Sequence, residues 1–463
     1  MKREKLKARA LEIGGIPANY TLLIEDFIEE KEAIFIWVNE YEDSGITVKL
    51  DSEGNLTNLI LDKKVNVEEG TTAVQKRELA EQFLLHHYPK ALQDFSYGFT
   101  RRMNHGDRFY YSQFLMDLPM GHTGCYIDVN DSGEITTFSY YGVKPLPAIP
   151  ENIIAIEALR EDVKSKLDFE IEIIHVSDLF LDVEEGLRLV YEPVNGYEKY
   201  KATQMIPTYK YQRDEEIPET YERLPEYEQQ AGTMSNEEII GITSDMEIIR
   251  EVDMGGEIGI VWRGRDWDVP EKGKTMNDFF KQQTESTVKA FISRASGKVI
   301  RFAWFYKRNG TLELSREECY EIAVRFLQSV IPEFYPFLQR IVRGDEDQPS
   351  EKESFMFRIH TGHDIPVQSE IIMVAVSTRT GLVHHFSGPS LEIGELKKLS
   401  TAPKISREEA AQIYLKHLDF QLAWEYDHDE KVHSLIYTPC EKESRKPIRY
   451  IDGMTGKIIV EKE

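Results

Sequence analysis

Apolar and polar residues alternate over much of the chain, in runs that repeatedly meet at a short polar loop closed by glycine. Glycine adopts a positive φ without steric cost, so a polar loop ending in glycine between two such runs predicts a β-hairpin. One such turn would be weak evidence, but five occur in a similar context. They are centred on Gly54, Gly133, Gly297, Gly381 and Gly456.

Helical periodicity precedes several of these strand groups. Leu79, Ala80, Phe83 and Leu84 fall on one face of a predicted helix. Two Ser-Arg-Glu-Glu segments place a serine N-cap three residues before a glutamate, which predicts a capping box at each helix start. The pattern therefore predicts an α+β protein of repeated units, each a helix followed by an antiparallel sheet of three to four strands. A lone helix on so few strands buries little apolar surface, so we expect neighbouring units to pack together or share sheets.

The order of these elements indicates that a larger block was duplicated. The helix at 79–84 recurs at 322–327, and the Leu-x-Tyr-x-Pro strand at 189–193 recurs at 435–439. We expect two homologous halves of three units, joined by an acidic linker that contains Pro218 and Pro225. The first half is 1–210 (units about 1–65, 70–145 and 149–210), the linker 211–232, and the second half 233–463 (units about 233–306, 313–390 and 405–463).

An insertion near residues 263–280 distinguishes the second half from the first. It contains Trp267 between two aspartates, and a tryptophan in a long loop suits recognition of a partner. The alternative, which we favour, is that the segment folds back over a sheet edge.

Length and charge narrow the classes of protein. A chain of 463 residues is too long to fold around a single hydrophobic core. Its net charge of −25 disfavours contact with nucleic acid or anionic lipid. No export signal and no apolar run near the ~20 residues of a membrane-spanning helix is present. The 3 cysteines are far apart, which is typical of a reduced, intracellular protein, so we expect a cytoplasmic location.

The duplication provides a test for chemistry, because a site built into the ancestral block should leave matching polar residues in both halves. Few polar matches exist; one is Tyr191 with Tyr437, on strands before proline, where we expect each hydroxyl to be anchored to backbone. The cysteines fail the test, since their counterparts are other residue types. These pairs are Cys125 with Met373, Cys319 with Lys76, and Cys440 with Val194.

The segment His360-Thr361-Gly362-His363-Asp364 is the most ligand-like cluster. Zinc takes about three or four such ligands, but the matching positions of the first half are Ser112, Leu115 and Met116. We interpret the cluster as a polar hairpin loop and expect no metal, no cofactor and no catalytic residue. Trp267, His360, His363 and Asp364 remain the candidate ligand-binding residues.

The helix opening with Ser/Thr-x-Glu-Glu, the hairpin glycine and the Leu-x-Tyr-x-Pro strand together resemble the YcdB/YcdC-type repeat of bacterial proteins, which is akin to the PepSY domain. Residues 406–459 match best, and looser matches extend over nearly the whole chain. The resemblance implies a cystatin-like unit of one helix and three strands. For PepSY relatives it also implies a role in binding or restraining peptidases. Members of this family are often exported, unlike the expectation for this chain.

The leading hypothesis is a non-catalytic binding or regulatory protein whose sheet edges accept an extended peptide strand of a partner. One alternative is a metal-assisted hydrolase that uses His360, His363 and Asp364. Another is a structural protein of a spore or envelope layer.

Overall fold

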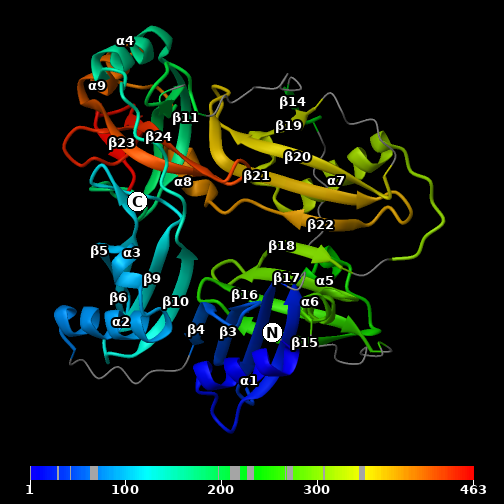
Figure 1. Cartoon of the computed structure of the whole chain (residues 1–463). Helices are drawn as coiled ribbons and strands as arrows, with labels where there is room; N and C mark the ends of the chain where they lie inside the picture. Colours follow the sequence, from blue (N-terminus) through cyan, green and yellow to red (C-terminus); the bar gives the residue numbers. More distant parts are fainter. Residues whose placement is uncertain are drawn as a thin grey trace.

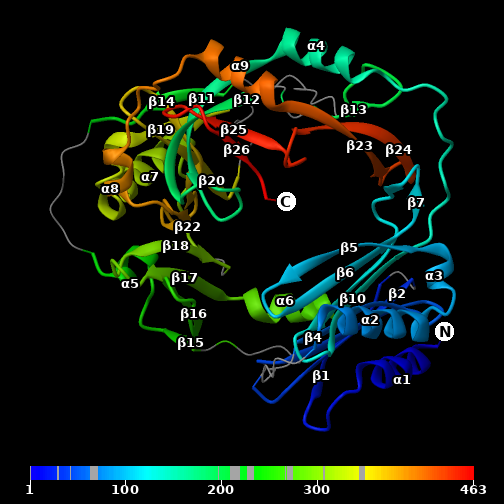
Figure 2. The same cartoon turned by 90° about the vertical axis from the view of Figure 1, so that its left-hand side faces the viewer.

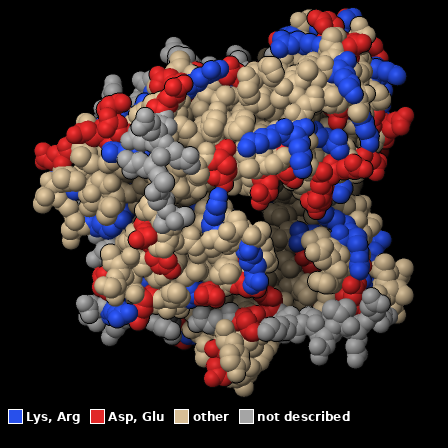
Figure 3. Space-filling model, turned by 180° about the vertical axis from the view of Figure 1, so that it is seen from behind, with Lys and Arg blue, Asp and Glu red and all other residues tan. Residues whose placement is uncertain are grey.

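The chain forms a mixed α+β structure with mostly antiparallel sheets, which confirms the predicted class (Figure 1). The computed structural model describes residues 2–28, 31–41, 43–62, 71–194, 196, 198–208, 219–226, 234–265, 267, 275–305, 308–343 and 350–462. Figure 2 shows the helices and strands arranged in a ring, and Figure 3 shows that the face seen from behind is hollowed.

The first two units share one eight-stranded sheet in the order β1-β2-β3-β4-β10-β9-β6-β5. Helices α1 and α2 contribute to a single core on this sheet, so the two units bury their apolar faces together. The elements are α1 (Arg3–Gly14), β1 (Thr21–Ile28), β2 (Glu32–Val38), β3 (Gly45–Asp51), β4 (Leu56–Asp62), α2 (Ala73–His87), α3 (Ala91–Asp94), β5 (Ser96–Met103), β6 (Gly106–Ser112), β7 (Phe114–Leu115), β8 (Leu118–Pro119), β9 (Gly124–Asn130) and β10 (Ile135–Gly142).

The fourth and fifth units repeat this arrangement, with the strand succession β15-β16-β17-β18-β22-β21-β20-β19. Residues Thr220–Arg223, within the segment expected to be a linker, instead form strand β14 on β19, where the Arg358 guanidinium lies 3.4 Å from the Tyr221 ring centre. The elements are α5 (Asn236–Ile240), β15 (Met246–Asp253), β16 (Glu257–Gly264), α6 (Met276–Thr284), β17 (Thr287–Ser293), β18 (Val299–Trp304), α7 (Arg316–Val330), η1 (Tyr335–Phe337), β19 (Leu338–Val342), β20 (Lys352–His360), β21 (Pro366–Ser377) and β22 (Val383–Ser387).

Local signals in the sequence account for the turns and the helix starts. All five turn glycines have a positive φ, between 67° and 91°. Ser315 and Ser406 form the predicted capping boxes, each accepting the backbone N–H of the glutamate three residues on.

The third and sixth units do not form separate sheets, contrary to expectation. Strand β12 pairs with β25 of the other half, and β13 pairs with β24, so each hairpin takes its next strand from the opposite half. We call this part the interlocked module. It consists of α4 (Ile156–Lys166), β11 (Asp168–Val176), β12 (Gly186–Val194), β13 (Tyr200–Lys201), α9 (Arg407–His417), β23 (Leu418–Asp427), β24 (Val432–Glu441), β25 (Ile448–Asp452) and β26 (Ile458–Val460), with α8 (Ile393–Lys398) before it.

Reciprocal hydrogen bonds close the interlocked module. The Tyr191 hydroxyl donates to the Ile405 carbonyl and the Tyr437 hydroxyl to the Ile154 carbonyl, each at 2.8 Å. Both tyrosines therefore anchor to backbone as expected, but across the halves rather than within them. The two bonds are the same contact made twice, once in each direction.

Ion pairs repeat this reciprocity on the module's surface. Arg160 of α4 donates to Asp419 at 2.7 Å, and Arg407 of α9 donates to Asp168 at 3.1 Å. Asp168 and Asp419 occupy matching positions of the two halves, within the Leu-Asp-Phe segments at 167–169 and 418–420. The side chains of these ion pairs are partly exposed, so the pairs contribute less to stability than the buried tyrosine hydrogen bonds.

We predict that Tyr191→Phe and Tyr437→Phe each lower the free energy of unfolding by about 1 kcal/mol, because each removes one buried hydrogen bond. Denaturant unfolding followed by circular dichroism measures this change. Tyr141→Phe is the control, since its side chain is 43% exposed. Equal stability of all three variants would contradict the reciprocal anchoring.

A protease site inserted within residues 211–218 tests the strand exchange itself. We expect the cleaved halves to remain together on gel filtration without denaturant, because the β12–β25 and β13–β24 pairings do not depend on the connection. Separation into two independently folded fragments would be inconsistent with the exchanged strands.

Candidate functional site

The strand register of the second half gathers basic side chains on one face of its sheet. Arg250 on β15 lies opposite Val261 on β16, and Val261 lies opposite Lys289 on β17. Successive residues of a strand point to opposite faces, so the neighbours Trp262 and Val288 enter the core. The basic residues thus occupy the face away from the core helices.

Helix α6, formed by the insertion, covers part of this basic face. The Arg263 guanidinium donates through Nη2 to the Gln282 carbonyl at 2.6 Å, which ties the last turn of α6 to β16. At its other end the Met276 backbone N–H donates to Asp26 Oδ2 on β1 at 3.0 Å. The described end of the insertion, at the start of α6, therefore contacts a sheet edge, β1 of the first half.

A groove with a volume of about 970 Å³ lies between α6, the basic face and the end of β2. We call it the inter-half groove. Its described lining contains three cations and no carboxylate, although the chain carries a net charge of −25. The lining residues are Leu23, Val38, Tyr41, Ile249, Arg250, Val252, Met254, Gly259, Ile260, Val261, Arg263, Phe279, Phe280, Gln282, Gln283, Thr284, Lys289, Ala290 and Phe291.

The groove is electrostatically unusual for this protein. Burial lowers the pKa of Lys289, and the nearby charges of Arg250 and Arg263 lower it further. Its Nζ atom lies 5.2 Å from the centre of the Phe305 ring, so the charge also rests against an aromatic face. A cation in these surroundings is stabilised by the arrival of an anion.

Gly259 lines the groove, and its nearest side-chain neighbours are Phe291 and Met254. A Cβ atom built there would lie 3.4 Å from the Phe291 ring, which is ordinary contact, and the backbone φ of Gly259 is not positive. A larger side chain at this position would therefore fill the groove without backbone strain.

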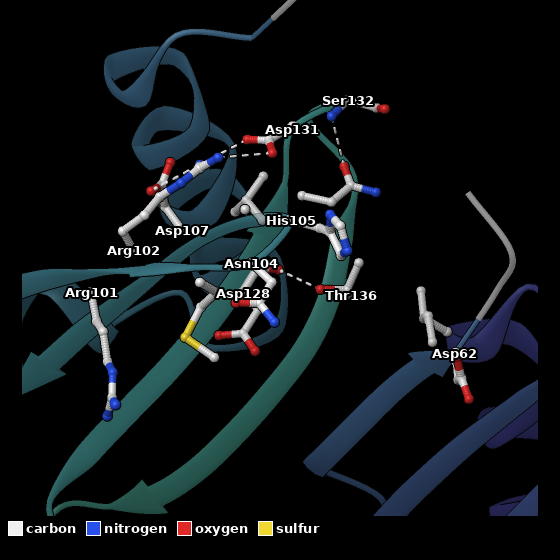
Figure 4. A pocket seen from close by; sticks show the side chains of 15 residues that line it. Asp62, Arg101, Arg102, Asn104, His105, Asp107, Asp128, Asp131, Ser132 and Thr136 are labelled. Atoms are coloured by element: carbon white, nitrogen blue, oxygen red, sulfur yellow. Dashed lines mark hydrogen bonds and ion pairs between the residues drawn. The ribbon is translucent and has the colours of Figure 1, made fainter. Parts of the chain in front are cut away.

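A second, polar pocket of about 560 Å³ lies where the β5–β6 and β9–β10 hairpins end (Figure 4). There Arg102, Asp107 and Asp131 point toward one another, and Arg102 binds both oxygens of Asp131 at 2.8 and 3.0 Å. Lys76 of α2, which is 3% exposed, donates to Asp107 at 2.8 Å and to Asp131 at 2.6 Å. These charges neutralise one another and fasten α2 to both hairpin turns.

Electrostatics supports this structural interpretation of the polar pocket. Hydrogen bonds from Arg102 and Lys76 hold the pKa of Asp131 well below its usual range. Burial opposes the charge of Lys76, but its hydrogen bonds to Asp107 and Asp131 outweigh burial and raise the pKa of Lys76. In the second half the corresponding position is Cys319, so the network belongs to the first half alone.

We predict that Lys76→Met lowers the free energy of unfolding at pH 7 by about 2 kcal/mol, because it leaves the buried Asp107 short of a partner. The depressed pKa of Asp131 means that its stabilising effect is complete above a pH of about 4 and is lost as the pH falls further. The deficit of the variant should therefore shrink below pH 4. Urea titrations at pH 7 and pH 3 measure it, and an unchanged deficit would contradict the role of the carboxylates.

A buried acidic pair lies in the interlocked module. Burial and the charge of Glu192 raise the pKa of Glu172 to about 8, and its Oε1 atom has no hydrogen-bond partner among the described residues. Burial therefore favours the neutral, protonated form of the Glu172 carboxyl.

The histidine cluster of the sequence forms the turn between β20 and β21. Buried His360 has its Nδ1 atom 2.6 Å from the Thr361 carbonyl oxygen and 3.6 Å from Asp364 Oδ1, and Asp364 also accepts from Gln339 at 2.9 Å. His363 is exposed. Within the described parts of the chain, no group of three or more His, Cys, Asp or Glu side chains is placed to hold a metal ion.

Trp267 is half-buried, and its backbone N–H donates to the Gly264 carbonyl at 3.2 Å. Its neighbours at 266 and 268–274 lie outside the described residues. Sequence reasoning did not identify the three groove cations, Arg250, Arg263 and Lys289. They lie on the neighbouring strands β15, β16 and β17, and Arg250 is beside a bulge in β15. The strand register was the signal that could have found them.

Two similar helix-covered sheets, joined by an interlocked module, define a tandem-repeat α+β protein. The chain belongs to the family of the YcdB, YcdC repeated domain, whose model matches residues 3–142 and 228–390. The first match covers the strands of the eight-stranded sheet, and the second covers β15 to β22 of a 13-stranded sheet that continues into the interlocked module. The repeat recognised by the family therefore contains two of the helix-and-strand units.

Relatives are similar over their whole length. Uncharacterized protein YcdB of Bacillus subtilis (strain 168) is 31% identical over 475 residues, covering 99% of this chain and 98% of YcdB. YcdC of the same organism is 28% identical, covering 95% of this chain and 96% of its own. Among solved structures, the Bacillus megaterium YpeB C-terminal domain aligns with 49% of this chain and 93% of its own, at 16% identity and a TM-score of 0.25. Among the described helices, none is long and apolar enough to cross a membrane.

Proposed function

We propose that this protein is a non-catalytic binding protein whose inter-half groove receives an extended peptide segment of a partner protein. The observation that carries the proposal is the groove itself, with its apolar floor and cations but no carboxylate among the described lining residues. Ligand sites are typically concave and mostly apolar, with a few polar groups that fix orientation.

An extended strand suits the surroundings of the groove. Strand β15 ends the sheet order, and edge strands present unpaired backbone groups that can pair with another chain. Its exposed apolar side chains offer contacts beyond the backbone, and Ile249, Val252 and Met254 also line the groove. Their exposed fractions are 44%, 37% and 57%.

The duplicated scaffold agrees with binding rather than catalysis. The basic face occurs in only one of two similar sheets, as expected of a surface acquired with the insertion and not of an ancestral active site. The role in binding peptidases implied by PepSY relatives is one form of this function. For the metal-assisted hydrolase and the layer protein, the described residues offer no comparable geometry.

We predict that Gly259→Leu abolishes peptide binding in the groove, because the added side chain occupies the space beside Phe291. Selection from a displayed peptide library on the purified protein should enrich sequences that bind the original chain at least tenfold more tightly than the variant. Fluorescence polarisation of the labelled peptides measures both affinities.

Gly256→Leu is the matched control, since Gly256 is exposed, has open space around it and is absent from the groove lining. Thermal unfolding checks that both variants fold. A library that yields no binder sensitive to Gly259→Leu would refute the groove as a peptide site.

A further inference from the structure

The inter-half groove contains hydrogen-bond donors that nothing in the described structure satisfies. The Nε atom of Arg263 and the Nε2 atom of Gln282 are both buried without an acceptor. A buried N–H group without an acceptor destabilises the folded state, so each of these donors is a candidate for completion by a ligand. Arg263 and Gln282, which carry these two donors, both line the inter-half groove.

The two residues are neighbours in the groove. Arg263 Nη2 donates to the backbone carbonyl of Gln282, so the guanidinium on β16 lies against the last turn of α6. Arg263 and Lys289 lie on the same face of the sheet, because Arg263 opposes Thr287 and Lys289 is two residues further along β17. The groove lining therefore takes one of these residues from each of β16, α6 and β17.

We propose that Arg263, Gln282 and Lys289 form a carboxylate-binding subsite that receives an acidic side chain of the bound peptide. This inference rests on the proposed function and names the chemistry that the groove selects. A carboxylate offers two acceptor oxygens to the donors of these side chains, and its charge offsets the repulsion among the groove cations.

The rest of the lining indicates the neighbours of the acidic residue. Ile249, Met254, Phe280 and Phe291 surround the cations with apolar surface, and Phe280 is 55% exposed. The favoured peptide is thus an extended segment with one Asp or Glu flanked by apolar side chains. A strongly acidic segment would lose this apolar contact and meet the negative charge of the remaining surface.

The test uses capped octapeptide pools, N-acetylated and C-amidated, with a central Glu or Gln and flanks randomised over Val, Ile, Leu, Phe and Thr. We expect the full chain to bind the Glu pool at least tenfold more tightly than the Gln pool by fluorescence polarisation. Gln282→Met and Lys289→Met should each reduce this preference to threefold or less. The readout is a ratio, so a general loss of groove shape does not imitate it.

Lys281→Met and Lys298→Met are the matched controls, because both side chains are exposed and absent from the groove lining. Both should keep the tenfold preference. Equal binding of the Glu and Gln pools that is still lost in Gly259→Leu would overturn the subsite while leaving peptide binding intact.

Two further outcomes would also overturn the subsite. A third pool, with a central Gln and a free C-terminal carboxylate, tests recognition of a chain end. Tighter binding of this pool than of the capped Glu pool would show that a chain end is recognised instead. If the original chain binds neither pool, the proposed function fails together with the subsite.

Discussion

The pairing of strands across the two halves determines the rest of this structure. Backbone N–H and C=O groups at a sheet edge require partners, and in the interlocked module each hairpin obtains them from the opposite half. Tyr191 and Tyr437 add the same contact in both directions. Neither hairpin completes its sheet alone, and the two halves meet again where α6 of the second contacts β1 of the first.

Duplication produced two like sheets, but the groove exploits their differences. The corresponding strand pairs differ in charge. Ile36 opposes Thr47 in the first half, whereas Val261 opposes Lys289 in the second. The position of Arg263 is occupied by Val38 in the first half. The insertion that forms α6 is likewise confined to the second half. A copied scaffold could thus keep its core and turns while one copy acquired a basic, partly covered face.

The sequence predicted the features that depend on local chemistry. Turn glycines with positive φ, the capping boxes at Ser315 and Ser406, and the α+β class follow from residues close together in the chain. It did not reveal the strand exchange, because the pairing of Val190 with Asp452 has no local signature. The groove was missed for the same reason: its cations are adjacent only through register, whereas the contiguous histidine cluster forms a hairpin turn.

The exchanged strands also affect the order in which the chain can fold during translation. Strands β11 and β12 leave the ribosome long before β25, so their hairpin must wait with an unsatisfied edge until the later half is made. An open edge in a nascent chain is prone to pairing with other molecules. Co-translational delay, rather than the final fold, is therefore the stage at which this architecture is most exposed to aggregation.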